Sequence, residues 1–298
     1  MNGQFDKDEQ KSGGKSGDGR CSNDGMCSND DQKVRCIGHF MDNLPYPPPI
    51  PEPKKYFHKR ELPSSLIQFS CREGKRLFQE SLTFGMAHAF FPLSEQFLSQ
   101  SEPAYCGLAT LIMILNAMGI DPNVVWKGPW RWYGSEEMIL KCCNIDAERI
   151  RRVGISMEEF CSLARCQGIR VDIKRPCAPS PDVDEHESNQ CNSIGAFRRD
   201  IIASAKKPPE HKTDADGAFL VVSYSRKYLG QTGGGHFSPV AAYAEEADKC
   251  LVLDVARFKY PPYWVSVEEL YESMRPEDAA TKKSRGWFMM YPTTKYDK

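Results

Sequence analysis

The chain has 298 residues with 39 Lys and Arg against 40 Asp and Glu, and this net charge of -1 excludes strong electrostatic attraction to nucleic acid or anionic membranes. Its longest apolar stretch, Cys106–Ile120, is shorter than the roughly 18–20 residues that span a bilayer. The 12 cysteines contain no CxxC pair, which argues against a disulfide scaffold and a structural zinc site. Because the amino terminus has no apolar signal segment, we expect a cytoplasmic protein with reduced thiols.

The beginning of the chain differs in composition from the rest. Residues 1–35 are mostly Gly, Ser, Asp, Asn and Lys, and they contain too little apolar surface to offset the entropy cost of folding. Their irregularly spaced cysteines fit incidental exposed thiols better than a metal-capture segment. Pro45–Pro53 predicts a stiff, extended linker. We therefore expect residues 1–55 to form a disordered tail and linker, and residues 56–298 to form the folded domain.

Helices are predicted in the first half of this domain. Apolar spacing predicts one helix over Ser70–Thr83 and another over Gly154–Ile169, the second with a capping box of Ser156 and Glu159. The segment Cys106–Gly119 is apolar on most sides, so it predicts a buried helix whose first residue is a cysteine.

The second half of the domain changes to runs of strand length. The predicted strands are Ala218–Ser225, Phe237–Tyr243, Cys250–Ala256 and Gly286–Tyr291. The Pro-containing segment 176–211 is typical of an irregular surface excursion. A helical first half packed against an antiparallel sheet predicts an α+β fold, with a groove where the two layers meet.

Cys106 is a candidate nucleophile. A thiol at a helix N-terminus lies beside unsatisfied backbone N–H groups, which favour its thiolate form. Gln100, six residues earlier, could turn its amide N–H toward the oxygen of an acyl group under attack, as part of an oxyanion hole. A cysteine that opens an apolar helix is more often a small core residue, so this position alone does not establish a nucleophile.

His236 and Asp254 strengthen the nucleophile interpretation. If the strands that contain them pair as a hairpin, the two residues lie nearly opposite each other. The carboxylate would then orient the imidazole, and the other ring nitrogen would face the thiol as general base and acid. The alternative, a core histidine satisfied by an aspartate at a strand end, remains open on spacing alone.

The order Cys, His, Asp with a preceding Gln resembles papain-like cysteine peptidases. Four segments are more specific and resemble the catalytic domain of phytochelatin synthase: 101–109 (SEPAYCGLA), 126–132 (WKGPWRW), 235–240 (GHFSPV) and 253–265 (LDVARFKYPPYWV). The resemblance covers about residues 57–292. It implies a papain-like fold with Cys106, His236 and Asp254 as the triad and Gln100 in the oxyanion hole.

The resemblance also implies the chemistry. The γ-Glu-Cys part of glutathione would be transferred to Cys106 with loss of glycine, and then to a second glutathione or a growing phytochelatin chain. Heavy-metal ions (Cd, Zn, Cu) would activate mainly as glutathione thiolate complexes, with no organic cofactor, and the function would be heavy-metal detoxification; a homodimer is compatible with it. The implied substrate-binding residues are Tyr105, Arg257, Lys259, Asp278 and Arg285. The metal-ligand candidates are Cys142, Cys143, Cys161 and Cys166.

Two alternatives remain beside this transpeptidase. A hydrolase would release glycine from glutathione or its conjugates through the same acyl-enzyme, with water as the acceptor. A cysteine-rich heavy-metal-binding protein belongs to a different class, and it is disfavoured because the cysteines are not clustered. Plant members of the family carry a long cysteine-rich region after the catalytic domain, whereas this sequence ends at Lys298.

Overall fold

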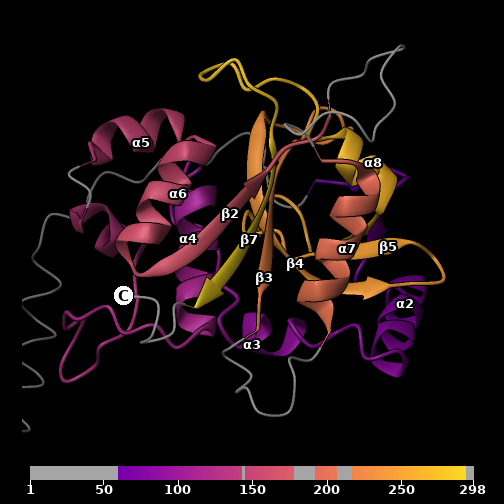
Figure 1. Ribbon diagram of the computed structural model, residues 1–298, viewed down its shortest axis with the longest axis horizontal. Coiled ribbons are helices and arrows are strands. Elements are labelled where there is room, and N and C mark those ends of the chain that lie inside the picture. The colour runs from indigo at the N-terminus through magenta and orange to yellow at the C-terminus, as the bar shows by residue number, and fades with distance from the viewer. Residues whose placement is uncertain (1–59, 143–144, 178–191, 207–216, 293–298) are drawn as a thin grey trace, which may run out of the picture. The chain divides into compact units, whose positions relative to one another are not determined.

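The computed structural model describes residues 60–142, 145–177, 192–206 and 217–292. The predicted tail and linker lie outside these residues, so the predicted domain boundary stays a prediction. The centre of the described part is a seven-stranded sheet in the order β1-β6-β5-β4-β3-β7-β2, in which every neighbouring pair is antiparallel (Figure 1). The strands are β1 (Ile67–Gln68), β2 (Ile169–Lys174), β3 (Phe219–Ser225), β4 (Gly235–Ala244), β5 (Lys249–Val252), β6 (Tyr263–Ser266) and β7 (Gly286–Pro292).

One face of the sheet packs against helices from the first half of the chain. These are α2 (Arg72–Thr83), α3 (Phe90–Glu95), α4 (Cys106–Ala117) and α6 (Met157–Cys166). Their apolar residues share a core with alternate residues of the strands, such as Phe219 and Val221 of β3. Helix α4 is buried along nearly its whole length, as its apolar sequence predicts. The expected packing of a helical first half on an antiparallel sheet is therefore present, and the fold is α+β.

The opposite face is also covered, which sequence reasoning missed. Helices α7 (Ile194–Ala205) and α8 (Val267–Glu272) lie across the sheet from α4 and α6 (Figure 1). They bury the other alternate residues of the central strands, including Leu220 and Val222. The predicted surface excursion over 176–211 is thus wrong for residues 194–205, which form a core helix capped by Ser193.

The remaining elements are the 3₁₀ helix η1 (Glu136–Cys142) and α5 (Ala147–Val153). The capping box of Ser156 and Glu159 is present, but the predicted helix over 154–169 is too long at both ends. It begins at Met157 and ends at Cys166, and the alternating sequence from Ile169 forms β2 instead. The predicted strand Cys250–Ala256 likewise ends early, at Val252.

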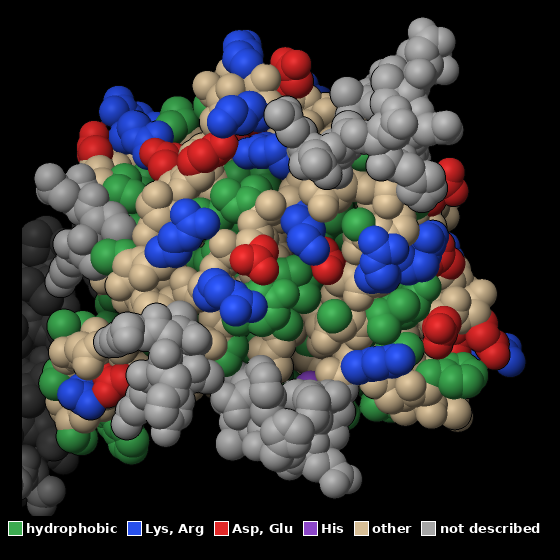
Figure 2. Space-filling view, in the orientation of Figure 1, with side chains coloured by type: hydrophobic (Ala, Val, Ile, Leu, Met, Phe, Trp, Pro, Cys, Tyr) green, Lys and Arg blue, Asp and Glu red, His purple; other side chains and the backbone are tan. Residues whose placement is uncertain are grey.

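Among the described residues, no helix is both long enough and apolar enough to cross a membrane. Acidic and basic side chains are interspersed on the face shown in Figure 2, with no large patch of one sign. This distribution agrees with the near-zero net charge.

Candidate active site

The nucleophile candidate Cys106 is the first residue of α4 and is half-buried. The N-cap residue, Tyr105, makes no side-chain hydrogen bond to the first turn, so the helix presents its backbone N–H groups beside the thiol. Helix α4 approaches β4 closely because Gly107 has no side chain; a Cβ there would lie 2.6 Å from Ile155 and 3.3 Å from Phe237. The hydroxyl of Thr110 also donates to the Phe237 carbonyl oxygen at 3.2 Å. These contacts hold Cys106 next to the strand that carries His236.

His236 and Asp254 are in contact. Their side chains meet at 2.9 Å between Nε2 and Oδ1, and both residues are buried. They come together because β4 and β5 are antiparallel, with a bulge between Val240 and Ala242. Asp254 follows the end of β5 rather than lying inside the ladder, so the predicted proximity is present, although the predicted strand pairing at Asp254 is not.

Arg226, which sequence reasoning missed, completes a buried charged cluster. It directly follows β3, and its Nη2 donates to both carboxylate oxygens of Asp254 at 2.8 Å. Asp254 Oδ1 also accepts from the backbone N–H of Ala256 at 2.9 Å. Despite its burial, Asp254 has a pKa well below the usual range because His236 and Arg226 supply positive charge and hydrogen bonds. The carboxylate is therefore ionised and held by three partners.

The pKa values of the thiol and the imidazole move toward each other. Burial raises the pKa of Cys106, but the charge and hydrogen bond of His236, with a hydrogen bond from the Phe237 backbone, outweigh it and leave the pKa lowered. Burial and Arg226 lower the pKa of His236, whereas Asp254 and Cys106 raise it, and the net direction is upward. Both shifts favour a thiolate beside an imidazolium.

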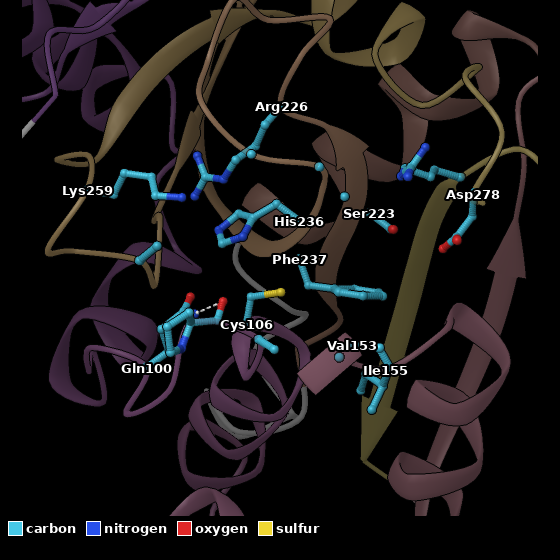
Figure 3. Close-up of a pocket in the computed structure, with 18 of the residues that line it drawn as sticks. Gln100, Cys106, Val153, Ile155, Ser223, Arg226, His236, Phe237, Lys259 and Asp278 are labelled. Atoms are coloured by element: carbon cyan, nitrogen blue, oxygen red, sulfur yellow. Dashed lines mark hydrogen bonds between the residues drawn. The ribbon is translucent and has the colours of Figure 1, made fainter. Parts of the chain in front are cut away.

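Gln100 lies next to Cys106, as Figure 3 shows, but its amide is already engaged. Its Nε2 donates to the carbonyl oxygens of Glu102 and Pro103, each at 2.8 Å, in the loop that leads to Cys106. Its Oε1 is buried without a partner. The backbone N–H of Gln100 donates to Val255 O at 2.9 Å, which ties this loop to the segment after Asp254. In this arrangement, an oxyanion role would require one of the two side-chain N–H bonds to be exchanged.

A cavity of about 410 Å³ opens over these residues. Figure 3 shows Cys106 and Gln100 on one side of it, His236, Arg226 and Lys259 across from them, and Asp278 toward the far end. The described residues lining it are Gln100, Pro103, Ala104, Cys106, Val153, Gly154, Ile155, Ser223, Arg226, Gly233, Gly234, Gly235, His236, Phe237, Ala256, Phe258, Lys259, Asp278, Ala279 and Arg285. A thiol, three cationic side chains and a carboxylate therefore face one space.

Three of the five predicted substrate-binding residues line this cavity: Lys259, Asp278 and Arg285. The other two lie elsewhere. Tyr105 is buried in the core with its pKa raised by burial, and Arg257 is exposed with its guanidinium 4.8 Å from the ring centroid of Phe97. Both belong to sequence motifs that include cavity residues, and their substrate-binding roles stay predictions.

The predicted metal ligands do not assemble among the described residues, where no group of three or more His, Cys, Asp or Glu side chains could hold a metal ion. Cys161 is buried, and burial raises its pKa to about 12, which opposes the thiolate form that binds metals. Cys166 is in a disulfide, as is Cys177, contrary to the expectation of reduced thiols. The side chain of Cys142 and all of Cys143 lie outside the described residues.

The sequence is similar to one family of known proteins. Residues 57–287 match the family model described as phytochelatin synthase. A fission yeast (Schizosaccharomyces pombe) protein named glutathione gamma-glutamylcysteinyltransferase is 41% identical over 80% of this chain and 52% of its own length. Proteins of that name from Lotus japonicus and Arabidopsis thaliana are 41% and 40% identical over 78% of this chain, and 44% and 43% of their own lengths.

The chain thus spans about half the length of the curated relatives that it matches. The family model, however, matches well over half of this chain. The chain therefore belongs to the phytochelatin synthase family.

Proposed function

We propose that this protein is a γ-glutamylcysteine dipeptidyl transpeptidase, which makes phytochelatins from glutathione through an acyl-enzyme on Cys106. One observation carries the proposal: a thiol of lowered pKa faces, across one cavity, a histidine bound to a buried carboxylate. The printed names of the relatives supply the substrate class. A nucleophile on a helix packed against the strand that carries the histidine also supports a papain-like fold.

In the first step, the Cys106 thiolate attacks the carbonyl carbon of the Cys-Gly peptide bond in glutathione. The tetrahedral intermediate collapses when the imidazolium of His236 donates its proton to the nitrogen of the departing glycine. The C–N bond breaks, a thioester to Cys106 forms, and glycine leaves with a neutral amine. Asp254 stabilises the imidazolium before this transfer and keeps the ring oriented after it.

In the second step, the α-amine of another glutathione or of a phytochelatin chain attacks the thioester. The now neutral His236 accepts a proton from this amine, and the Cys106 thiolate leaves. The new amide joins γ-Glu-Cys to the acceptor, and the thiolate–imidazolium pair is restored. If water attacked instead, the same residues would release free γ-Glu-Cys, so the hydrolase alternative differs only in the acceptor.

The far end of the cavity suits the γ-glutamyl end of the substrate, which carries an ammonium and a carboxylate on one carbon. Arg285 uses its Nη1 for the carbonyl oxygens of Pro276 and Glu277, while its Nε is buried without a partner. That edge of the guanidinium lies against Gly235, a cavity residue. We propose that Arg285 binds the carboxylate and that Asp278, also in the lining, binds the ammonium.

Lys259 is placed to interact with a second carboxylate. Its ammonium donates to Thr232 O at 3.3 Å, and burial and the nearby charge of Arg226 lower its pKa. When the surroundings destabilise the charged form of an ammonium group, an anion that binds beside it stabilises that charged form. We propose that Lys259 binds a substrate carboxylate at the catalytic end of the cavity. The substrate-binding role that the resemblance implies for Arg257 would require its side chain to leave Phe97.

Heavy-metal ions enter this proposal as part of the substrate. The acceptor would be the thiolate complex of glutathione with Cd²⁺, Zn²⁺ or a copper ion. The first step uses only Cys106, His236 and Asp254, so metal should accelerate the second step more than the first.

The test is incubation of the protein with glutathione, with and without cadmium, followed by rapid-quench measurement of glycine and mass analysis of the thiol products. Wild type should release a burst of about one glycine per protein in both conditions, and longer (γ-Glu-Cys)n-Gly products should increase with cadmium. Cys106→Ser should show no burst. Cys71→Ser is the matched control, because Cys71 is an exposed free thiol that caps α2, a position where serine serves equally well.

Three outcomes would contradict the proposal in different ways. Free γ-Glu-Cys as the main product would favour the hydrolase. A burst that appears only with cadmium would point to a metal site on the protein. Near-normal turnover by Cys106→Ser would show that the reaction does not pass through an acyl-enzyme on Cys106.

A further inference from the structure

Gln231 does not line the cavity, but it contacts Arg226, which does. Its side chain is buried, and its Oε1 accepts from Arg226 Nη1 at 2.6 Å. Its backbone N–H also donates to the carbonyl oxygen of Arg226 at 2.8 Å. Because a guanidinium can only donate, the amide oxygen and not the nitrogen must face it. The described residues that line the cavity include Arg226 but not Gln231.

The amide of Gln231 is only half satisfied. Its Nε2 is buried with no hydrogen-bond partner, which costs free energy that a nonpolar side chain would not. The hydrogen bond that the side-chain oxygen accepts from Arg226 offsets this free-energy cost. Gln231 thus presents a neutral acceptor to a buried cation.

Arg226 needs such an acceptor because one nitrogen makes both of its bonds to Asp254. Nη2 alone contacts Oδ1 and Oδ2. Arginine and carboxylate groups prefer a fork in which two nitrogens contact two oxygens. A guanidinium held at one nitrogen can turn into that fork, and the carboxylate would turn with it, away from His236.

The other contacts of Arg226 do not prevent this rotation. Its guanidinium carbon lies 5.2 Å from the ring centroid of Tyr260, and its Cδ lies near Gly233, where an added Cβ would come within 3.2 Å. Gly233 also has φ of +124°, which favours glycine. These contacts restrict the aliphatic part of the Arg226 side chain and the plane of its guanidinium group. The hydrogen bond from Nη1 to Gln231 fixes the direction of Nη1, and so keeps the guanidinium from rotating into the fork with Asp254.

We propose that Gln231 is a positioning residue, which holds Arg226 in the orientation that leaves Asp254 Oδ1 bound to His236. It acts through Arg226 and Asp254, and it contacts neither the thiol nor the substrate cavity. The inference deepens the proposed function, but its main test measures the thiol itself and needs no turnover.

The test compares Gln231→Met, which has similar length but no acceptor, with wild type. The pH dependence of Cys106 alkylation by iodoacetamide is followed by mass analysis of the peptide that contains it. The charged groups that face the thiol and the imidazole are Arg226 and Asp254, with Lys259 beside Arg226, and none of them is changed. With His236 deprived of part of its counter-charge, the alkylation midpoint should move up by about one pH unit, which leaves roughly tenfold less thiolate below the midpoint.

Thr232→Val is the matched control in the same loop. Thr232 is exposed, and the loop is held there by its backbone, whose N–H donates to Tyr260 Oη at 2.8 Å and whose carbonyl accepts from Lys259. This variant should keep the wild-type midpoint. If Gln231→Met does not fold, Gln231→Asn keeps an amide but withdraws it by one methylene group, and it should show the same upward shift.

The outcomes separate positioning from a structural role and from the proposed reaction. An unchanged midpoint together with a lowered unfolding temperature would overturn the inference, because Gln231 would then only support the loop. An upward shift in a protein whose wild type releases no glycine from glutathione would support the inference and overturn the proposed function.

Discussion

Asp254→Asn should reduce both stability and activity, and the structure separates the two losses. The carboxylate is fully buried and is the ion-pair partner of Arg226, whose side chain is 3% exposed. Asparagine keeps the shape, but it places an N–H₂ group against a guanidinium N–H and leaves that cation buried without a counter-charge. Removing one partner of a buried ion pair costs about 3–5 kcal/mol. Loss of the orienting carboxylate beside His236 should lower glycine release by about 10⁴-fold, the size of the effect when the imidazole tautomer is misdirected in Ser-His-Asp triads.

Asp248→Asn is the matched control for stability. Asp248 also pairs with an arginine, Arg198, but the two side chains are 39% and 36% exposed. A solvent-exposed pair of this kind contributes about 0–1 kcal/mol. Urea unfolding of both variants at neutral pH, alongside the glycine burst, measures the two effects separately. Equal and small losses of unfolding free energy in the two variants would refute the reasoning that Arg226 depends on Asp254 for its counter-charge.

Three further predictions concern other parts of the site and core. The pKa of Cys106 is lowered and that of His236 is raised, so the rate of acylation should rise as the pH passes the pKa of Cys106 and fall as the pH passes the pKa of His236. A burst rate that still increases well above pH 9 would contradict the ion pair. Phe288→Ala should cost about 3–5 kcal/mol in urea unfolding, because Phe288 is fully buried and stacks on Phe160 at 4.7 Å between ring centroids. Cys161→Ala should leave the cadmium dependence of product length unchanged in the mass assay, and a lost dependence would show that this buried thiol binds metal after all.

Sequence reasoning located the elements whose signal is local. The unbroken apolar stripe of α4 and the Ser156 capping box need no tertiary information, and both are present. Strand β2 also has a local signal, since Ile169, Val171 and Ile173 alternate with charged residues. The sequence analysis does not predict this strand, because the helix expected over 154–169 includes its first residue.

The charged cluster shows what local signals do not contain. The contact between His236 and Asp254 is expected if their strands pair as a hairpin, although the bulge in β4 shifts the register of that pairing. Arg226 follows a strand in a loop, far from Asp254 in sequence, and the two meet because β3 pairs with β4 and β4 pairs with β5. Its presence changes the expected result for Asp254→Asn, because the aspartate now stabilises two cations rather than one.

The position of β7 in the sheet also has a consequence for how the protein is made. Strand β7 lies between β3 and β2, with Met290 paired to both Phe219 and Val171, and in the described sheet β2 has no other neighbour. Until residues 286–292 leave the ribosome, β3 therefore exposes one edge and β2 exposes both. Open edges of this kind pair readily with other chains. Synthesis that stalls before Gly286 should thus yield chains that are prone to aggregate through the exposed edge of β3, the strand next to β4.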